Sequence, residues 1–274
     1  MKIYFLLACG ITWFLLLPVI LSHQGIIALN VTDDWHFLGA LGPILAAFYV
    51  ARRRGVFHLW LVGLLRTHVE TGWLLISVIS PFILFFIAYI IALFIDSSTE
   101  PIESLINSET INLHWVVMTL IAAIAYGIGE EAGWRGFALP WLQKKENALK
   151  ATMLLAMMHA VWHIPFFFYR FEFTVGMAIG FFIGLVAGTV WLTFLYNSTG
   201  GSAFVAIIWH TGWNIVNQVA ILLSDVMLAV MSTSVIILAV YIVSKWGSES
   251  LSPKPRYTFH TTHQDNNYDK IFNL

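Results

Sequence analysis

Residues 113–140 read LHWVVMTLIAAIAYGIGEEAGWRGFALP, an apolar run that leads into two adjacent carboxylates and a guanidinium. The run from Leu113 to Gly129 is long enough to cross the hydrocarbon core of a bilayer as a helix. An ionisable side chain in that core costs at least about 2.5 kcal/mol. We therefore expect Glu130, Glu131 and Arg135 to be paired, to face the protein interior and to serve a function.

The rest of the chain has the same apolar character. Of its 274 residues, 59% are hydrophobic and 11% are charged, against about 25% charged in a soluble domain. Backbone groups in lipid must be satisfied within their own segment, which favours helices over barrel strands. The eight apolar stretches are Ile3–Leu21, Phe37–Ala51, Trp73–Ile95, Leu113–Gly129, Leu149–Phe168, Val175–Tyr196, Ala203–Leu223 and Val226–Ser244.

These stretches predict an all-α fold, a polytopic transmembrane bundle of about eight spans. It forms one domain over residues 1–246, with a motif-bearing core at 113–218 and a polar cytoplasmic tail at 247–274. Twelve of the 14 Lys and Arg residues fall on one side of the bundle if the N-terminus is cytoplasmic. Both termini are thus predicted to be cytoplasmic, as in a multi-pass protein of a bacterial plasma membrane.

The charge balance and the cysteine content add little about partners. The net charge of -1 favours neither acidic nor basic partners, and we expect the chain to contact the lipid bilayer and no nucleic acid. The single cysteine, Cys9, excludes an internal disulfide.

The charged motif divides its residues between two helical faces. Glu131 and Arg135 are four residues apart, which predicts an ion pair on one face. Glu130 is rotated by about 100° from Glu131 and lacks that local partner. This arrangement suggests that Glu131 and Arg135 hold the helix, while Glu130 is free to accept a proton. The alternative is that all three only clamp helices together.

The fifth stretch contains MMHAVWHIPFFF, residues 157–168. His159 and His163 are spaced like the two histidines of the zinc motif H-E-x-x-H, but Ala160 replaces its glutamate. A base would have to come from another helix, and Glu130 is the candidate. The alternative is a pair of hydrogen-bonded core histidines.

The seventh stretch contains TGGSAFVAIIWHTGWN, residues 199–214. His210 and Asn214 share a helical face, and an asparagine amide is a suitable donor to a developing oxyanion. The alternative is a hydrogen bond between helices. Counted from the loops, Glu130, His163 and His210 lie at similar depths, so we expect them to line one cytoplasm-facing cavity.

Together these motifs resemble the CPBP intramembrane protease family, also called the Abi or CAAX-protease family, which includes the type II CAAX prenyl endopeptidases. The family's Glu-Glu-x-x-x-Arg motif matches Glu130, Glu131 and Arg135. Its His-x-x-x-Asn motif matches His210 and Asn214. Its aromatic-x-x-x-His motif is matched less well, because His159 stands at the aromatic position if His163 is the functional histidine. If His159 is that histidine, Leu155 takes the aromatic position.

The resemblance implies an intramembrane endopeptidase in which a glutamate activates water for attack on a peptide bond. It implies a catalytic group of Glu130, His163, His210 and Asn214, supported by Glu131, Arg135 and His159. A site of Glu130, His163 and His210 with a water in the fourth position would suit zinc, although a glutamate-activated water needs no metal. The implied substrate is a membrane-associated protein or peptide, which in this family can be lipidated.

Two other functions stay open. One is a non-catalytic membrane partner, for example a bacteriocin self-immunity factor, a role with which the family is associated. The other is a proton-coupled transporter with Glu130 as the coupling site, which the lack of an obvious internal repeat disfavours.

A further pattern predicts how the sixth stretch packs. Gly176, Gly180, Gly184 and Gly188 are each four residues apart, which favours close packing against a neighbouring helix. On this interpretation, Gly184→Leu reduces stability in detergent. The other interpretation is a groove for substrate access.

Overall fold

The computed structural model describes residues 1–106, 108–170 and 174–259, and these ranges contain helices and no strands. The helices of the first half are α1 (Lys2–His23), the 3-10 helix η1 (Asp33–Ala40), α2 (Leu41–Arg53), α3 (Phe57–Leu64), α4 (Thr71–Ile95) and α5 (Ile102–Ile106). Those of the second half are α6 (Leu113–Gly133), the π-helical η2 (Trp134–Ala138), α7 (Leu139–Gln143), α8 (Ala148–Trp162), the 3-10 helix η3 (Ile164–Phe168), α9 (Val175–Ser198), α10 (Ala203–Leu223) and α11 (Asp225–Ser250).

Polar caps set the starts of the helices that carry the motifs. The side chain of Asn112 accepts a hydrogen bond from the Trp115 amide at the start of α6. Asn147 does the same for the amide of Lys150 at the start of α8, and Ser202 for that of Val205 at the start of α10. Such caps satisfy backbone donors that a helix leaves unpaired at its first turn.

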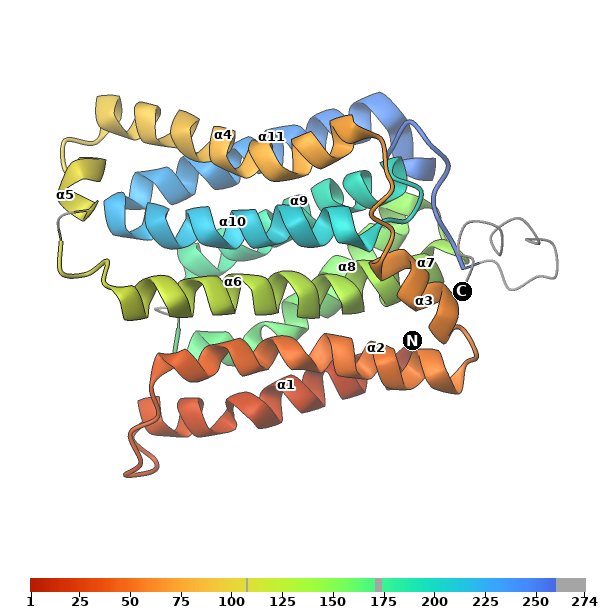
Figure 1. Cartoon of the computed structure of the whole chain (residues 1–274), viewed down its shortest axis with the longest axis horizontal. Helices are drawn as coiled ribbons and strands as arrows, with labels where there is room; N and C mark the ends of the chain where they lie inside the picture. Colours follow the sequence, from red (N-terminus) through yellow and green to blue (C-terminus); the bar gives the residue numbers. More distant parts are fainter. Residues whose placement is uncertain (107, 171–173, 260–274) are drawn as a thin grey trace.

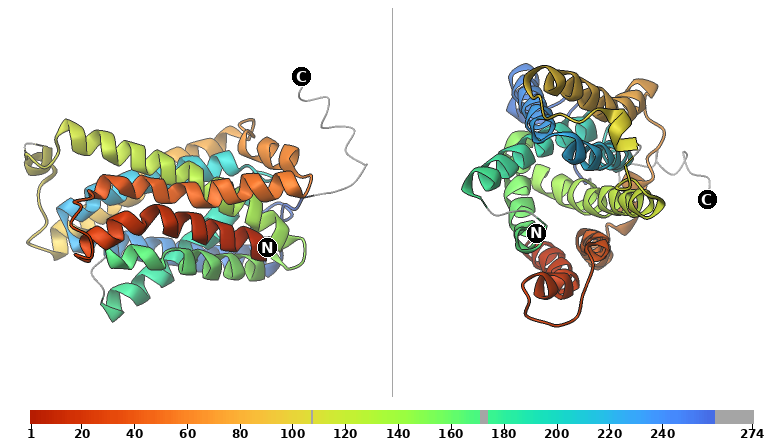
Figure 2. Two further views of the ribbon diagram at one scale, coloured as in Figure 1. Left: turned by 90° about the horizontal axis from the view of Figure 1, so that it is seen from below. Right: turned by 90° about the vertical axis from the view of Figure 1, so that its left-hand side faces the viewer.

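The long helices lie side by side in one bundle (Figure 1). Helix α6 packs against α2 on one side and α10 on the other, and α10 also packs against α4 and α11. Helices α1 and α2 form a pair at one edge of the bundle (Figure 2). The motif-bearing helices α6, α8 and α10 are thus held between an α1–α2 pair and an α4–α11 layer.

The predicted all-α membrane bundle is confirmed, with one difference in the count of spans. In the described ranges, seven helical segments are long and apolar enough to cross a membrane. The expected span Ala203–Leu223 forms helix α10 but is not among the seven. Its polar residues explain this: His210, Asn214, Asn217 and Gln218. It lies against α6, α4 and α11.

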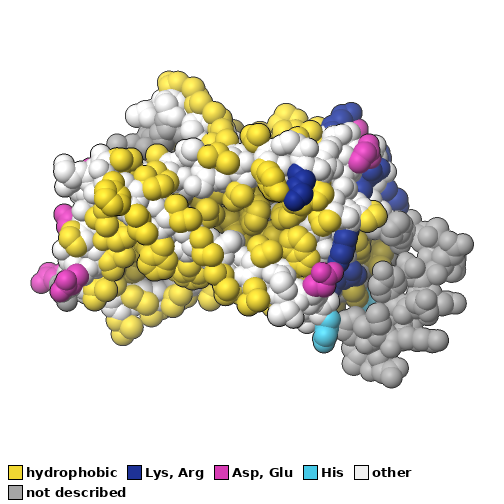
Figure 3. Space-filling model, turned by 90° about the horizontal axis from the view of Figure 1, so that it is seen from above, with side chains coloured by type: hydrophobic (Ala, Val, Ile, Leu, Met, Phe, Trp, Pro, Cys, Tyr) yellow, Lys and Arg dark blue, Asp and Glu magenta, His cyan; other side chains and the backbone are white. Residues whose placement is uncertain are grey.

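The two ends of the bundle differ in charge. Lys and Arg side chains gather at the end where the chain begins and α11 finishes, as the surface view shows (Figure 3). The distribution is the one that the predicted topology requires, with Met1 and the last described residue, Phe259, at the basic end. Which side of the membrane this end faces stays a prediction.

The start of the expected polar tail is packed instead of extending into solvent. Helix α11 continues through Gly247 to Ser250, and the segment that follows is described to residue 259. Leu251 and Phe259 in it are buried, with 0% and 1% of their surface exposed. The rest of the expected tail, 260–274, lies outside the described residues.

The packing prediction for the glycines of α9 is wrong. A Cβ atom built on Gly176, Gly180, Gly184 or Gly188 would meet nothing within 4 Å. Among the described residues, no atom of a neighbouring helix comes within 4 Å of a Cβ at these four positions, so the glycines face open space. Glycine spacing alone indicates a smooth face without showing that anything packs on it.

Candidate active site

Glycines on α6 bring its neighbours close to the charged motif. A Cβ on Gly127 would lie 2.1 Å from the Thr211 hydroxyl of α10, and one on Gly129 would lie 2.1 Å from the Ala40 carbonyl oxygen. Both distances are far below van der Waals contact, so only glycine permits this approach. Glu130 follows at once, about 26 Å along the helix from Leu113 and about 20 Å before Gln143 at the end of α7. The motif thus lies near mid-membrane depth.

Glu130 meets a histidine of α8 inside the bundle. Oε2 of Glu130 lies 2.5 Å from Nε2 of His159, and the two side chains are each 4% exposed. The contact does not have the alignment of a hydrogen bond, and neither atom has another hydrogen-bond partner among the described residues. A small rotation of either side chain would align the two atoms, and the carboxylate and the imidazole could then exchange a proton without access to bulk water.

His163 completes a three-residue group. It caps the end of α8, and its Nδ1 lies 3.0 Å from the carbonyl oxygen of His159. An Nδ1–H that donates to this carbonyl leaves Nε2 as the acceptor or metal ligand. In the described ranges, Glu130, His159 and His163 form the group in which one ligand atom from each lies within 4.8 Å of the others.

Glu131 organises the second half of the site. Its Oε1 accepts a hydrogen bond from Nη1 of Arg135 at 2.9 Å, which confirms the pair predicted from the spacing. The same oxygen lies 2.7 Å from Nδ1 of His210 on α10. Glu131 and Arg135 are 0% and 1% exposed, so a buried carboxylate joins one guanidinium to one imidazole.

Asn214 lies one helical turn beyond His210 on α10. It is partly exposed, and within the part of the chain that the structure describes its side chain makes no hydrogen bond. An amide that is neither buried nor engaged is available to a substrate.

Aromatic residues that sequence reasoning missed enclose the Glu130–His159 contact. The indole of Trp134 lies 5.0 Å from the His159 ring, measured between centroids, and that of Trp162 lies 5.6 Å away. Trp162 donates to the Thr12 hydroxyl of α1 at 2.8 Å, and Trp60 of α3 donates to the Ala132 carbonyl oxygen at 2.9 Å. Because these bonds join elements distant in sequence, no local pattern would have revealed them.

The structure brings the predicted site residues together, in a grouping that differs from the expected one. His159, expected to support the site, contacts Glu130, whereas His163 is the third member of that group. His210 pairs with Glu131 and does not belong to it. Within the described ranges, the donor set that lies together is therefore Glu130, His159 and His163, not Glu130, His163 and His210.

This donor set fits a divalent metal in kind. One carboxylate and two imidazoles with an open fourth position are the ligands of many catalytic zinc sites. Oε2 of Glu130 and both ring nitrogens of His159 have no hydrogen-bond partner among the described residues, which also suits a bound metal ion. Two ligands of one tetrahedral zinc are about 3.3 Å apart. The Glu130–His159 contact is 2.5 Å, so the carboxylate would have to turn slightly to share an ion.

The fold and the site define a class: a multi-pass helical membrane protein with a glutamate–histidine cluster inside the bundle. Residues 112–216, which contain every residue of that cluster, match the family model described as Type II CAAX prenyl endopeptidase Rce1-like. The chain is also 28% identical over 102 residues to CAAX prenyl protease 2 of Methanococcus maripaludis. That match covers 35% of this chain and 36% of the relative, so it spans about a third of either protein. Over this part, the chain is therefore similar to the type II CAAX prenyl endopeptidases.

Proposed function

We propose that the chain is an intramembrane endopeptidase that hydrolyses a peptide bond with a water activated by Glu130. The observation that carries this proposal is the buried contact between Oε2 of Glu130 and Nε2 of His159, beside His163. A hydrolase in a membrane must hold water and a base where lipid would exclude both, and a carboxylate grouped with two imidazoles provides such a place.

In the proposed mechanism, Glu130 takes a proton from a water molecule while the oxygen attacks the carbonyl carbon of the scissile peptide bond. His159 and His163 orient the water and stabilise the carboxylate. Asn214 and His210 lie on α10, where they donate to the oxygen that gains negative charge. Collapse of the tetrahedral intermediate breaks the C–N bond, and the proton held by Glu130 passes to the leaving amine.

Glu131 and Arg135 position these groups without touching the reacting atoms. Glu131 accepts from Nδ1 of His210, and the same buried carboxylate stabilises the imidazolium form of that ring, in which Nε2–H can also donate toward the substrate. Arg135 balances the charge of Glu131, which leaves Glu130 as the carboxylate without a guanidinium partner. If a metal ion takes part, Glu130, His159 and His163 would hold it, and it would lower the pKa of a bound water.

The proposed substrate is a membrane-associated protein or peptide. The matching family model is described by prenyl endopeptidase activity, and the relative is named a CAAX prenyl protease. A prenylated C-terminal peptide is therefore the first substrate to test, because prenylation of a C-terminal Cys-a-a-X motif anchors a protein to the membrane. The resemblance covers too little of either chain to assign that substrate.

The test compares new protein termini in membranes from cells that express the chain or its Glu130→Gln variant. Glu146→Gln serves as the matched control, because Glu146 pairs with Lys150 in a partly exposed surface contact. We expect termini that are present with the wild type and Glu146→Gln and absent with Glu130→Gln, at equal expression and melting temperature. Identical termini in all three would refute the proposal and favour a non-catalytic partner such as an immunity factor.

Purified protein tests the chemistry directly. A farnesylated peptide and its unprenylated counterpart, each incubated with wild type and Glu130→Gln, separate hydrolysis from substrate preference. Cleavage of both peptides supports a protease without prenyl selectivity. Metal analysis of the same active preparation decides the role of zinc, because active protein without stoichiometric metal would exclude it.

A further inference from the structure

An apolar groove runs along the outer face of the α1–α2 pair, away from the candidate active site. It has a volume of about 420 Å³ and is lined by Leu6, Gly10 and Phe14 of α1 and by Leu41 and Leu45 of α2, among others. The residues that form its walls are exposed, with 75% of the surface of Phe14 and 45% of that of Leu45 accessible. In a membrane, this groove opens toward the lipid, and it lies outside the residues matched by the family model.

Two glycines shape the groove in opposite ways. At Gly42 the helices touch, since a Cβ there would lie 2.0 Å from the Thr12 hydroxyl and 2.5 Å from the Ala8 carbonyl oxygen. At Gly10 a Cβ would meet nothing within 4 Å. Close contact at Gly42 holds the pair together, and the missing side chain at Gly10 leaves a channel on its outer face.

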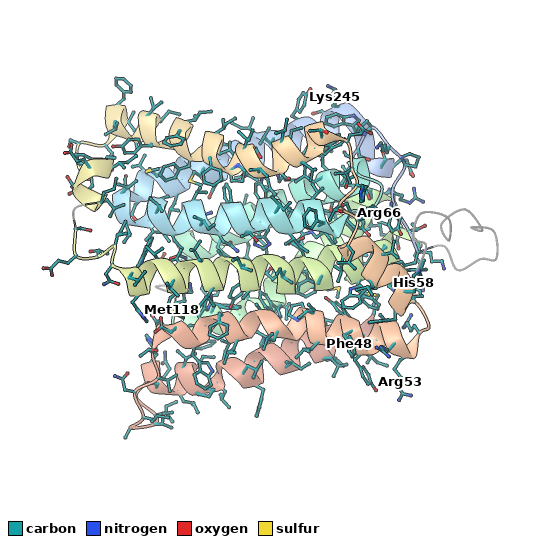
Figure 4. The ribbon with its side chains drawn as sticks, viewed as in Figure 1. Phe48, Arg53, His58, Arg66, Met118 and Lys245 are labelled. Carbon is teal, nitrogen blue, oxygen red and sulfur yellow. The ribbon has the colours of Figure 1, made fainter. Side chains whose placement is uncertain are left out.

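Beyond the groove, α2 carries a cation at the basic end of the bundle. Tyr49 and Arg53 continue the i, i+4 row of Leu41 and Leu45, in a stripe that turns by about 40° at each step. Nε of Arg53 donates to the Tyr49 hydroxyl at 3.3 Å, and Arg53 lies at the rim of the bundle and points away from it (Figure 4). None of the ion pairs formed by the described residues includes Arg53.

The length of this face suits one leaflet. Leu41 and Arg53 are about 18 Å apart along the helix. Half of a hydrocarbon core of about 30 Å is about 15 Å, so Arg53 reaches headgroup level when Leu41 is at the midplane. The groove is apolar, and Arg53 lies two helical turns beyond Leu45 without a carboxylate partner among the described residues. This combination is complementary to one ligand chemistry: an acyl chain that carries an anionic headgroup.

We propose that the α1–α2 groove binds one acyl chain of an anionic phospholipid whose phosphate is held by Arg53 and the Tyr49 hydroxyl. The bidentate fork of arginine is suited to a phosphate, and tyrosine is common at membrane interfaces. Arg52 has the same charge as Arg53 but makes a different contact. Its guanidinium lies over the Phe57 ring of α3, 4.2 Å from the centroid, so Arg52 serves as a control for charge alone.

The first test is native mass spectrometry of the full-length protein in detergent, titrated with phosphatidylglycerol or phosphatidylcholine. We expect one phosphatidylglycerol to bind in preference to phosphatidylcholine. Arg53→Gln should weaken its binding about fivefold, whereas Arg52→Gln should leave it unchanged. Equal losses in both variants would overturn the proposal, because only the general positive charge of this end would then attract lipid.

The second test fills the groove. Gly10→Phe should abolish binding of the tightly held lipid without lowering the melting temperature, because the new side chain enters open space. Leu45→Trp is a second filler should Gly10→Phe fold poorly. Unchanged lipid binding in a folded filler variant would overturn the groove as the site. A dimer that the filler dissociates would show instead that a second copy of the chain occupies it.

Discussion

Nε2 of His159 lies 2.5 Å from Oε2 of Glu130, which joins α8 to α6 through two buried side chains. The sequence motif favoured His163 as the functional histidine, and in the structure His163 is the neighbour of this pair rather than its member. The geometry therefore separates the two histidines: one contacts the proposed base, and the other caps α8 beside it.

His159→Ala should lower kcat by about 10²- to 10⁴-fold, the usual contribution of a group that takes part in proton transfer. His163→Ala should have a smaller effect on kcat, since His163 lies beside the Glu130–His159 contact and not in it. The measurement is single-turnover cleavage of a substrate identified from the membranes, with melting temperatures as the folding control. A larger loss for His163→Ala would reverse the two assignments.

Arg135→Met should destabilise the protein by roughly 3–5 kcal/mol, because it leaves the carboxylate of Glu131 buried without its cation. The double variant Arg135→Met with Glu131→Gln should recover part of that loss, since the uncompensated charge is gone. Unfolding in detergent by denaturant measures both. Equal stability of the single and double variants would show that the buried pair is not what holds α6 in place.

The parts of this site that the sequence predicted are those set by a helical period. The Glu131–Arg135 pair follows from i, i+4 spacing alone. The contact of Glu131 with His210 depends on how α10 is rotated against α6, which close approach at Gly127 decides. Gly127 permits that approach, but its presence in the sequence does not show which helix packs on it.

The spacing of the two histidines explains why the sequence could not separate their roles. Helix α8 stops at Trp162, three residues before Pro165, and His163 is its C-cap. The two rings still share a face, with centroids 4.6 Å apart, so the spacing in the sequence places both beside Glu130 without showing which one contacts it. The buried Phe259 was an apolar residue in a segment predicted to be a polar tail.

Substitution by alanine should have opposite effects on stability at Gly127 and Gly184, although both glycines lie in apolar helical stretches of the sequence. Gly127→Ala should cost about 1–3 kcal/mol, because its Cβ would lie 2.1 Å from the Thr211 hydroxyl. Gly184→Ala should leave stability unchanged or raise it by up to about 1 kcal/mol, since its Cβ meets open space and alanine favours helix. Thermal unfolding in one detergent compares them. Similar losses at both positions would mean that α9 packs against another molecule.

Asp96 should add a pH dependence to stability. Hydrogen bonds from Ser224, first, and from Ser98 lower the pKa of Asp96 from 3.8 to about 2. Because the folded state has the lower pKa, its contribution is present above about pH 4 and is lost as the pH falls through about 2. The difference in melting temperature between wild type and Asp96→Asn should therefore be largest at neutral pH and shrink toward pH 2. If the difference in melting temperature did not change with pH, the asparagine amide would cause the destabilisation, and the ionisation of Asp96 would not.

The segment 251–259 should behave as a strap across the basic end of the bundle. The Asn197 amide donates to Gln143 and to the Ser250 carbonyl oxygen, both at 2.8 Å, and the backbone amide of Tyr257 donates to Asn197 at 3.1 Å. Phe259 closes the strap against Phe137 and Trp141. The bonds connect the end of α7 to the ends of α9 and α11.

Phe259→Ala should release this strap while the bundle stays folded. Truncating a buried phenylalanine costs about 3–5 kcal/mol, and here local opening of the segment would absorb that cost. Trypsin should then cut after Arg256 at least about 100-fold faster than in the wild type, whereas Pro255 protects the bond after Lys254. Phe94→Ala is the matched control, because Phe94 is 85% exposed. If cleavage stayed slow and the melting temperature fell instead, the strap would be part of the bundle's cooperative core.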